Sequence, residues 1–578
     1  MEGRINNFRG KGSYFIFILL IFISFGSFAQ APNQQGFEIM KNMDIYSNMI
    51  KELDLDYVDE INPGELTRTG IDAMLQSLDP YTNFIPESEV EDYKFITTGQ
   101  YGGIGALIHQ QGGYVVISEP YMGSPAYKSG LKAGDKILEI NGKQVKGKSY
   151  DDVSTFLKGQ AGTTVDLVVQ RDGESSPLEK TITREIIKID NIPYSGMVDT
   201  TIGYIKLAGF TQNAAKELKQ AYLKLKEAHT LHGIIIDLRG NGGGLLNEAV
   251  DIANIFVERG QEIVTTKGKM SDKNRTHMTM SPPVDLTIPV VILVDRQSAS
   301  ASEILAGSIQ DLDRGVIIGQ RTFGKGLVQN VVPLSYNAQM KITVAKYYIP
   351  SGRCIQAIDY SHKMKDGSFT IIPDSLIRAF KTKGGRTVYD GGGINPDLVM
   401  QPERFSNVAL SLYGKFMIFD YATKFTREHP TIPPAMNFEI SDSVYNDFLQ
   451  FIQGKDYSYS TKSERALEQL KEIALKENYF DAVKDDYSHM KSLMENDKKE
   501  DLTRYKNQIK ELLMLEIVTR YYYQKGKVES SLKNDPELVT AIATLKDKEK
   551  YSAILSGKYV QPKPEIPVNS EEDEETEN

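Results

Sequence analysis

The chain has 578 residues, 40% of them hydrophobic and 25% charged, a composition typical of globular proteins at a length beyond one hydrophobic core. We therefore expect three or four domains and exclude a disordered scaffold. The formal net charge is −10, and no basic stripe interleaved with aromatic residues is present, which argues against a nucleic-acid partner.

The N-terminus has the pattern of an export signal. Basic residues precede the run YFIFILLIFISF at 14–25, and the small residues Ser27 and Ala29 follow it. Because twelve residues are few for a helix that crosses a bilayer, we expect a signal peptide, 1–29, cleaved after Ala29, and a periplasmic or cell-envelope location. An uncleaved anchor is the alternative. The lone cysteine, Cys354, excludes an intramolecular disulfide.

Composition changes several times along the rest of the chain. The predicted regions are an N-terminal helical region (30–97), a small domain of short strands and glycine turns (98–185), a core of alternating strands and helices (186–400), a helical C-terminal region (401–560) and an acidic disordered tail (561–578). The predicted fold class is therefore multidomain α/β, with the small domain inserted between the N-terminal helices and the core.

Residues 98–185 resemble a PDZ domain, through the loop YGGIGAL at 101–107 and the stretch GSPAYKSGLKAGDKILEINGK at 123–143. In PDZ domains a glycine loop presents backbone N–H groups to the terminal carboxylate of a peptide, which then pairs as an extra strand. The resemblance implies that the carboxylate is bound by Gly103, Ile104 and Gly105. It also implies an apolar groove formed by Ile104, Ala106, Val153 and Phe156. An ordinary β-turn and domain core would suit the same residues.

A glycine-rich turn follows a buried strand in GIIIDLRGNGGGLL, residues 233–246. The turn lacks the Gly-Lys-Ser/Thr of a nucleotide-binding loop, and its glycines miss the spacing of a dinucleotide fingerprint. Phosphate binding is therefore disfavoured. Backbone N–H groups in this turn, at the start of a helix near Leu245, are suited to a developing negative charge such as an oxyanion.

Three serines stand at a second strand-to-helix turn, in SASASE at 298–303. Ser300 and Glu303 have the spacing of a capping box, in which the serine only satisfies N–H groups of the first helical turn. None of the seven histidines lies in a motif that would pair it with these serines, so a Ser/His/Asp triad has no candidate.

Lys325 is a candidate partner for Ser300. It lies between two glycines and before a strand-like segment, so that Lys325 and Gln329, four residues apart, are expected on one face. Burial beside a helix N-terminus disfavours the charged form of a lysine, which makes the amine a usable base, and Gln329 could hold it in place. A solvated surface lysine is the alternative.

The chain resembles the C-terminal processing peptidases, or tail-specific proteases, over about residues 40–400. Besides the PDZ segment, the stretches that carry the resemblance are SLDPYTNF (77–84), GYIKLAGF (203–210), IIIDLRGNGGGLL (234–246), SASASEILAG (298–307), GQRTFGKGLVQ (319–329), AKYYIPSGRCIQ (345–356) and GGINPD (392–397). Two features depart from the family pattern: Cys354, where serine or threonine is commoner, and the long helical segment after residue 401.

The resemblance implies a crotonase-like α/β serine peptidase core with a Ser/Lys dyad. Ser300 would be the nucleophile, Lys325 the general base and Gln329 its orienting amide. The oxyanion would be bound by the backbone N–H of Ala301 and by that of Gly243 or Gly244. No metal or organic cofactor is implied.

The predicted function is that of an exported serine endopeptidase that recognises substrate C-termini through its PDZ domain and cleaves proteins with the dyad. Its expected partners are proteins or peptides with free C-termini, and a homodimer or adaptor contact through the helical C-terminal region stays open. The main alternative is a catalytically silent PDZ-containing binding protein of the cell envelope. A thioester-binding hydratase would need no Ser-plus-Lys pair, and a zinc peptidase would need a His-Glu-x-x-His motif, which is absent from the sequence.

Overall fold

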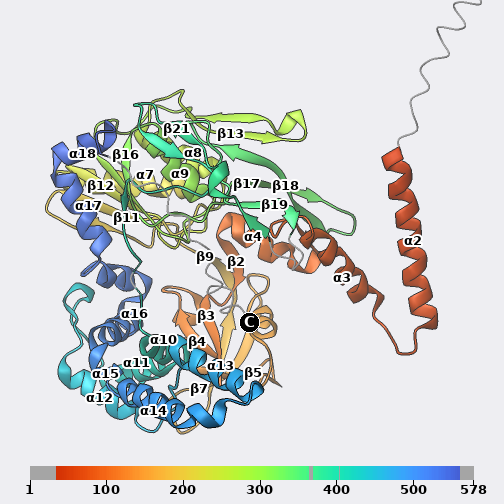
Figure 1. Cartoon of the computed structure of the whole chain (residues 1–578), viewed down its shortest axis with the longest axis vertical. Coiled ribbons are helices and arrows are strands. Elements are labelled where there is room, and N and C mark those ends of the chain that lie inside the picture. The colour runs from red at the N-terminus through yellow and green to blue at the C-terminus, as the bar shows by residue number, and fades with distance from the viewer. Residues whose placement is uncertain (1–33, 364–368, 403, 560–578) are drawn as a thin grey trace, which may run out of the picture. The chain divides into compact units, whose positions relative to one another are not determined.

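A computed structural model describes residues 34–363, 369–402 and 404–559 (Figure 1). The predicted signal peptide and acidic tail lie outside the described residues. The chain separates into two compact units with a boundary after Phe84, and each is described by itself. Within the described ranges, no helix combines the length and the apolar character that a membrane crossing requires.

The first unit contains the helices α2 (Gln34–Asp56) and α3 (Pro63–Gln76). The Asn62 side chain caps α3 by accepting the N–H groups of Gly64 and Glu65, and Pro63 occupies the first helical position. The helix ends at Gln76, shortly before the Asp79-Pro80 pair. The buried Asp79 then accepts the N–H of Thr82 at 2.9 Å, which closes a turn.

The second unit opens with η1 (Glu87–Glu89) and α4 (Val90–Thr98). It then enters the inserted domain through β2 (Gln100–Gly103), which pairs antiparallel with β9 (Glu185–Lys188) where the chain leaves that domain. The domain's sheet has the order β3–β4–β5–β7–β8, with β6 beside β5, so β3 is an edge strand. Its elements are β3 (Ala106–Gln111), β4 (Tyr114–Pro120), α5 (Pro125–Lys128), β5 (Lys136–Ile140), β6 (Lys143–Gln144), α6 (Tyr150–Leu157), β7 (Thr164–Gln170) and β8 (Leu178–Thr183).

The core contains a six-stranded sheet of order β10–β11–β12–β15–β16–β23, parallel except for β10. Its strands are β10 (Tyr194–Met197), β11 (Ile202–Lys206), β12 (Gly233–Asp237), β15 (Val290–Val294), β16 (Gly315–Gly319) and β23 (Leu398–Val399). The strands β12, β15 and β16 are buried throughout, and apolar except for Asp237 at the end of β12, because both faces of a parallel sheet are covered.

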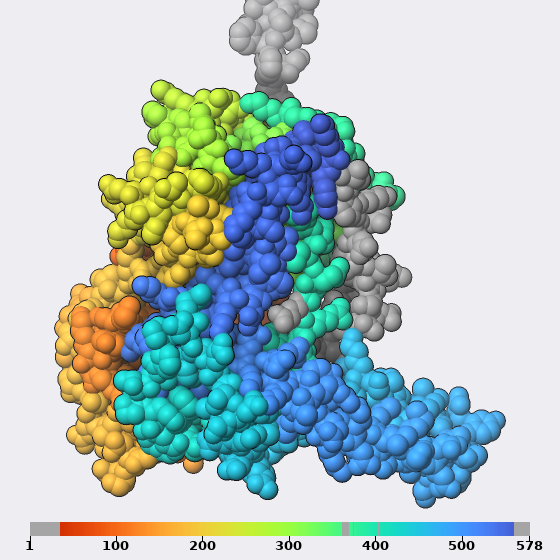
Figure 2. Space-filling model, turned by 90° about the vertical axis from the view of Figure 1, so that its left-hand side faces the viewer, coloured from red at the N-terminus to blue at the C-terminus, as the bar shows by residue number. Residues whose placement is uncertain are grey.

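Different parts of the chain cover the two faces of this sheet. On one face, Ile234, Ile236 and Ile292 pack with α7 (Ala214–Ala228), α8 (Leu246–Phe256) and α9 (Ala301–Asp311). On the other face, Ile235 and Val291 pack with α17 (Pro536–Lys546) and α18 (Lys548–Leu555). Figure 2 shows these last helices, in dark blue, lying along the core. Both helices belong to the helical C-terminal region expected from the sequence, and their apolar residues pack on the core sheet.

A second sheet, β14–β13–β18–β17, stands beside the first. Its strands are β13 (Glu262–Gly268), β14 (Arg275–Met278), β17 (Leu327–Pro333) and β18 (Gln339–Tyr348). Two small hairpins follow it, β19 (Ile358–Lys363) with β20 (Phe369–Ile371) and β21 (Ala379–Lys381) with β22 (Thr387–Tyr389). The remaining strand, β1 (Asn83–Ile85), spans the boundary of the two units.

The helical region has a core of its own, built around Tyr421, Phe448 and Ile517. Its helices are α10 (Asn407–Gly414), α11 (Met417–Glu428), α12 (Asp442–Ile452), α13 (Lys462–Lys476), α14 (Phe480–Lys498), α15 (Asp501–Arg504) and α16 (Lys506–Ser531). The long helix α16 leads from this region to the core, and it is broken at Tyr523, whose φ is 55°.

We expect Leu545→Ala, in α17, to lower the free energy of unfolding of the core by about 2–4 kcal/mol, because Leu545 is buried against the sheet. Leu493→Ala is the matched control, since Leu493 of α14 is 56% exposed and should change stability by less than about 0.5 kcal/mol. Urea unfolding of both variants measures the difference. Equal effects would contradict the assignment of α17 to the core.

Candidate active site

The three serines at the start of α9 have different surroundings. Ser298 is buried, and its hydroxyl donates to the carbonyl of Leu238 at 2.9 Å. Ser302 is also buried, and its hydroxyl donates to the carbonyl of Asn241 at 2.8 Å. These two serines therefore fasten the start of α9 to the glycine-rich turn after β12, whereas Ser300, between them, is only partly buried.

Ser300 is the N-cap residue of α9 and forms the predicted capping box with Glu303. The strong hydrogen bond of this pair runs from the Ser300 N–H to Glu303 Oε2, at 2.8 Å. The Ser300 hydroxyl stands beside the Glu303 N–H without making a regular capping hydrogen bond, and that N–H donates to the Ser300 carbonyl at 2.9 Å. Helix capping therefore leaves the hydroxyl available for chemistry.

The backbone of Ser300 adopts φ 55° and ψ −112°, a conformation that residues other than glycine rarely occupy. Such conformations persist only where the surrounding structure holds them, and they gather at functional sites. Here the two backbone groups of Ser300 are both engaged: Glu303 accepts the N–H, and the Tyr347 hydroxyl lies 3.1 Å from the carbonyl.

Glu303 connects the backbone of Ser300 to that of Lys325. Its Oε2 accepts both the Ser300 N–H at 2.8 Å and the Lys325 N–H at 2.9 Å. Its Oε1 accepts the Gly324 N–H at 2.7 Å and the Thr322 hydroxyl at 2.6 Å. The carboxylate is 0% exposed, so four donors from two segments surround one buried group.

Tyr347 makes a second connection. Its hydroxyl lies within hydrogen-bond distance of the carbonyls of both Ser300 and Lys325. The sequence contained a signal for Glu303, as the partner in a capping box, but none for Tyr347, which comes from β18 and reaches the site only through the fold.

Lys325 is partly buried and precedes β17, which begins at Leu327. Gln329 therefore lies in the strand, whereas Lys325 lies before it. The alternation of side chains along a strand does not extend to Lys325, so it cannot by itself place the two residues on one face. The Gln329 amide donates to the Thr343 hydroxyl at 3.3 Å.

The glycine turn lies against the start of α9. A Cβ on Gly243, where φ is 101°, would lie 2.9 Å from both the Ala301 nitrogen and the Ser300 Cβ. The Gly243 N–H donates to Asn241 Oδ1 at 2.9 Å. By contrast, the N–H groups of Gly244 and Ala301 have no hydrogen-bond partner within the described part of the chain. Of the two glycines proposed from the sequence, Gly244 has the N–H that is not engaged.

In the PDZ domain, Gly103 lies in β2 and pairs with Glu185, so it belongs to a strand ladder rather than to an open loop. Ile104 and Gly105 connect β2 to β3. An antiparallel bridge between Gly103 and Lys158 directs the Ile104 N–H toward the end of α6. The Gly105 N–H has no partner among residues 34–363, 369–402 and 404–559, and it is the donor of this loop that is suited to a carboxylate.

The edge strand β3 packs beside α6, which leaves a free strand edge next to a helix. Of the residues predicted to form the groove, Ile104 and Val153 are buried in the domain core, Ala106 is partly buried, and Phe156 is 41% exposed. Ile104 and Val153 are therefore core residues, and Phe156 is the residue of this set that is most accessible to a peptide.

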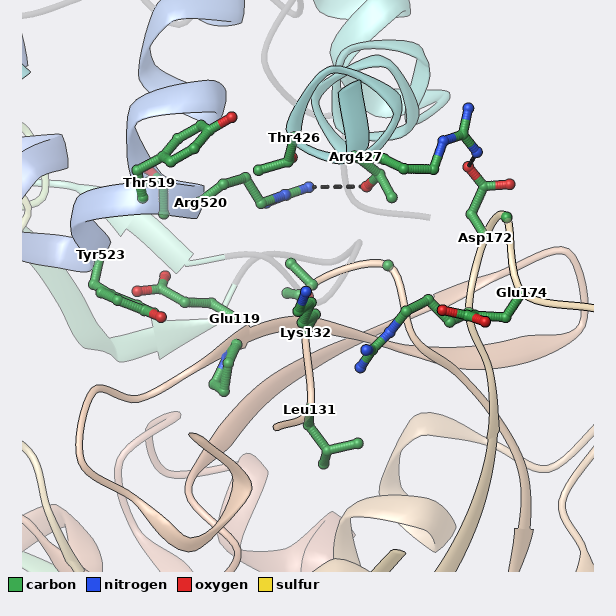
Figure 3. Close-up of a pocket in the computed structure, with 18 of the residues that line it drawn as sticks. Glu119, Leu131, Lys132, Asp172, Glu174, Thr426, Arg427, Thr519, Arg520 and Tyr523 are labelled. Carbon is green, nitrogen blue, oxygen red and sulfur yellow. Dashed lines mark hydrogen bonds and ion pairs between the residues drawn. The ribbon is translucent and has the colours of Figure 1, made fainter. Parts of the chain in front are cut away.

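A cavity of about 630 Å³ lies between the PDZ domain and the helical region (Figure 3). It is lined by Glu119, Leu131 and Lys132 on one side and by Arg427, Arg520 and Tyr523 on the other. Burial raises the pKa of Glu119, whose Oε1 has no hydrogen-bond partner in the described structure. None of the predicted catalytic residues lines this cavity, and within the described residues no group of three or more His, Cys, Asp or Glu is placed to hold a metal.

Three family models match the chain: peptidase family S41 at residues 201–364, a PDZ domain at 116–171, and the C-terminal helical domain of probable PDZ-proteases at 408–545. Fold and site thus define a PDZ-containing peptidase with a helical C-terminal domain, which confirms the predicted fold class.

Curated relatives support this assignment. The carboxy-terminal-processing protease of Bartonella bacilliformis is 35% identical over 322 residues, which cover 55% of this chain and 73% of that protein. The carboxy-terminal processing protease CtpA of Bacillus subtilis is 34% identical over 306 residues, which cover 53% of this chain and 65% of that protein. The chain belongs to the carboxy-terminal-processing protease family.

Among solved structures, the photosystem II D1 C-terminal processing protease matches at 30% identity, with a TM-score of 0.35, over 61% of this chain and 86% of that one. The PDZ domain of a carboxy-terminal protease from Vibrio cholerae, solved in complex with a peptide, matches at 32% identity, with a TM-score of 0.15, over 16% of this chain and 99% of that one.

The site predicts an unusual dependence of stability on pH. Burial raises the pKa of Glu303 to about 7 from an ordinary value of 4.5, against the opposing effect of its hydrogen bonds. A raised pKa means that the folded state binds the proton more tightly than the unfolded state. The resulting stabilisation is complete below about pH 4.5 and is lost as the pH rises through 7.

We therefore expect the free energy of unfolding of the wild type, relative to that of Glu303→Gln, to fall by on the order of 3 kcal/mol between pH 4.5 and pH 8. Urea unfolding of both proteins across this range measures the difference, and the variant removes the contribution of every other titrating group. A difference that rises with pH would show that Glu303 stays ionised well below neutrality.

Proposed function

We propose that the chain is an exported serine endopeptidase that binds the C-terminus of its client through the PDZ domain and cleaves with Ser300 and Lys325. The observation that supports this most directly is the shared clamp of Glu303 and Tyr347 on the backbones of Ser300 and Lys325. Such a clamp fixes a nucleophile relative to its base, and a purely structural helix cap would not need the second segment.

In the proposed reaction, the Ser300 hydroxyl oxygen attacks the carbonyl carbon of the scissile bond, and the neutral amine of Lys325 takes the hydroxyl proton. The tetrahedral oxyanion accepts hydrogen bonds from the N–H groups of Ala301 and Gly244. Collapse breaks the C–N bond, and Lys325 gives its proton to the leaving amine. Water then attacks the acyl-enzyme with Lys325 again as base, which regenerates Ser300. We assign to Gln329 the role of orienting the amine of Lys325.

For recognition, the client's terminal carboxylate would accept the N–H of Gly105, and its last residues would pair along the free edge of β3. Phe156 of α6, which is 41% exposed, would contact the client's apolar side chains. The Gly105 N–H, which has no partner in the described part of the chain, directly precedes the free edge of β3, as a β-strand addition requires.

Export rests on the basic residues, apolar run and Ala29 of the N-terminal sequence. A homodimer or adaptor contact is assigned to the helical region, where Leu470, Ile473 and Leu493 of α13 and α14 are each more than half exposed.

Ser300→Ala should lower kcat for an unfolded client by several orders of magnitude while leaving stability within about 1 kcal/mol of wild type. Lys325→Ala should have a similar effect, and the double variant should be little worse than either single one, because members of a dyad act as a unit. Ser406→Ala is the matched control: Ser406 caps α10, so its loss should cost about 1 kcal/mol of stability without loss of activity.

Steady-state rates and labelling by a fluorophosphonate probe are the measurements. Substantial residual activity in Ser300→Ala would reject the nucleophile. An absence of labelling and of proteolysis in the wild type would favour the silent binding protein instead.

Peptides with a free, apolar C-terminus should be cut faster than the same peptides amidated, because a charge-assisted hydrogen bond is about twice as strong as a neutral one. Cleavage of one unfolded client with each type of end measures the preference. Phe156→Ala should raise KM for the free-ended client and leave its kcat unchanged. Equal rates for the two ends would reject recognition of the tail and leave the chemistry of Ser300 untouched.

A further inference from the structure

Two carboxylates at the start of α17 form ion pairs with Arg239, at the beginning of the glycine turn. Asp535, the N-cap residue of α17, lies 2.6 Å from Arg239 Nη2, and Glu537, in the first turn, lies 2.5 Å from Arg239 Nη1. The side chains of Arg239, Asp535 and Glu537 are 19%, 9% and 11% exposed, so these pairs are largely shielded from water. An ion pair that is shielded from water, and in which each end nitrogen of the guanidinium bonds a different carboxylate, holds the arginine side chain in place more firmly than an exposed pair.

The other side of the Arg239 guanidinium faces the end of β12. Its Nη2 lies 2.7 Å from Asp237 Oδ2, and its Nε lies 3.1 Å from both oxygens of that carboxylate. Asp237 also accepts the Tyr204 hydroxyl at 2.6 Å and lies 3.1 Å from Lys206 Nζ. Burial opposes ionisation of Asp237, but Lys206 and Arg239 outweigh it and hold its pKa below the ordinary range.

Arg239 leads directly into the turn that carries the proposed oxyanion donor. The next residue, Gly240, donates its N–H to the Asp295 carboxylate at 2.9 Å. Asn241 then accepts the Gly243 N–H on its side chain and the Ala299 N–H on its carbonyl. This succession of hydrogen bonds holds the turn up to the residue before Gly244.

We propose that Asp535 and Glu537 are positioning residues of the peptidase reaction: through Arg239 they hold the turn 240–244 so that the Gly244 N–H reaches the oxyanion. The inference rests on the proposed function. Its physical basis is that a largely buried guanidinium that loses two of its three carboxylates has unpaired donors, and the backbone that carries it then shifts to expose them. A displacement of an oxyanion donor by a fraction of an ångström is enough to lower the rate.

The test is the double variant Asp535→Asn/Glu537→Gln, which removes both charges, keeps the shape of the side chains and keeps a capping residue at position 535. We expect kcat to fall by about 10- to 100-fold with KM within about twofold of wild type, since donors to the transition state are affected and client binding is not. Amide hydrogen exchange of residues 238–245 should quicken about tenfold or more in the same variant.

Lys546→Met is the matched control. Lys546 belongs to the same helix and also pairs with the core, 2.6 Å from Asp199, but at the opposite end of α17. This variant should leave kcat, KM and the exchange of residues 238–245 unchanged.

An unchanged kcat in the double variant would overturn the inference, as would an equal loss in Lys546→Met. Amide hydrogen exchange distinguishes a failure of this inference from a failure of the proposed function. If the wild type shows no Ser300-dependent proteolysis, the proposed function fails, and with it the catalytic role of the pair. If amide hydrogen exchange of residues 238–245 is unchanged in the double variant, Asp535 and Glu537 do not position the turn, whatever the activity.

Discussion

One buried carboxylate, that of Glu303, is the interaction on which the candidate active site depends. A buried carboxylate is tolerated only where donors surround it, and here the donors come from the residues around Ser300 and those around Lys325. Satisfying the carboxylate therefore fixes the distance between two segments more than twenty residues apart. The Tyr347 hydroxyl adds a contact with the carbonyls on the other side of the same two residues.

The same physical rule operates at the glycine turn, with the charges reversed. The guanidinium of Arg239 is largely buried, and carboxylates from β12 and from the start of α17 satisfy it. The C-terminal helices also cover the second face of the central sheet through Leu538, Leu545 and Ile554. Apolar packing and ion pairs thus connect α17 and α18 to the glycine turn beside Ser300. The end of the helical C-terminal domain is therefore packed as part of the peptidase core.

Much of the local structure could be predicted. The strands at 233–237 and 290–294 are apolar runs except for Asp237 at the end of the first, as buried parallel strands are, and glycines or serines mark the turns that follow them. The PDZ domain and the family were likewise predicted from ordered motifs, and the family comparisons confirm both. The catalytic roles of Ser300, Lys325 and Gln329 stay predictions. The packing of α17 and α18 on the central sheet was not predicted, because an amphipathic pattern shows that a helix packs but not against which surface.

By itself, the sequence determined the fold class, the order of the domains and the residue types that could serve as nucleophile, base and oxyanion donors, because these follow from periodicity, turn chemistry and motif order within short windows. Only the tertiary structure decided which backbone N–H groups are engaged and which are not. The Gly243 N–H donates to Asn241, and Gly103 pairs within a strand ladder, whereas among the described residues the N–H groups of Gly244, Ala301 and Gly105 have no partner. The reason is that a turn's hydrogen-bond partners are supplied by segments distant in the chain, whose arrival depends on the packing of the whole core.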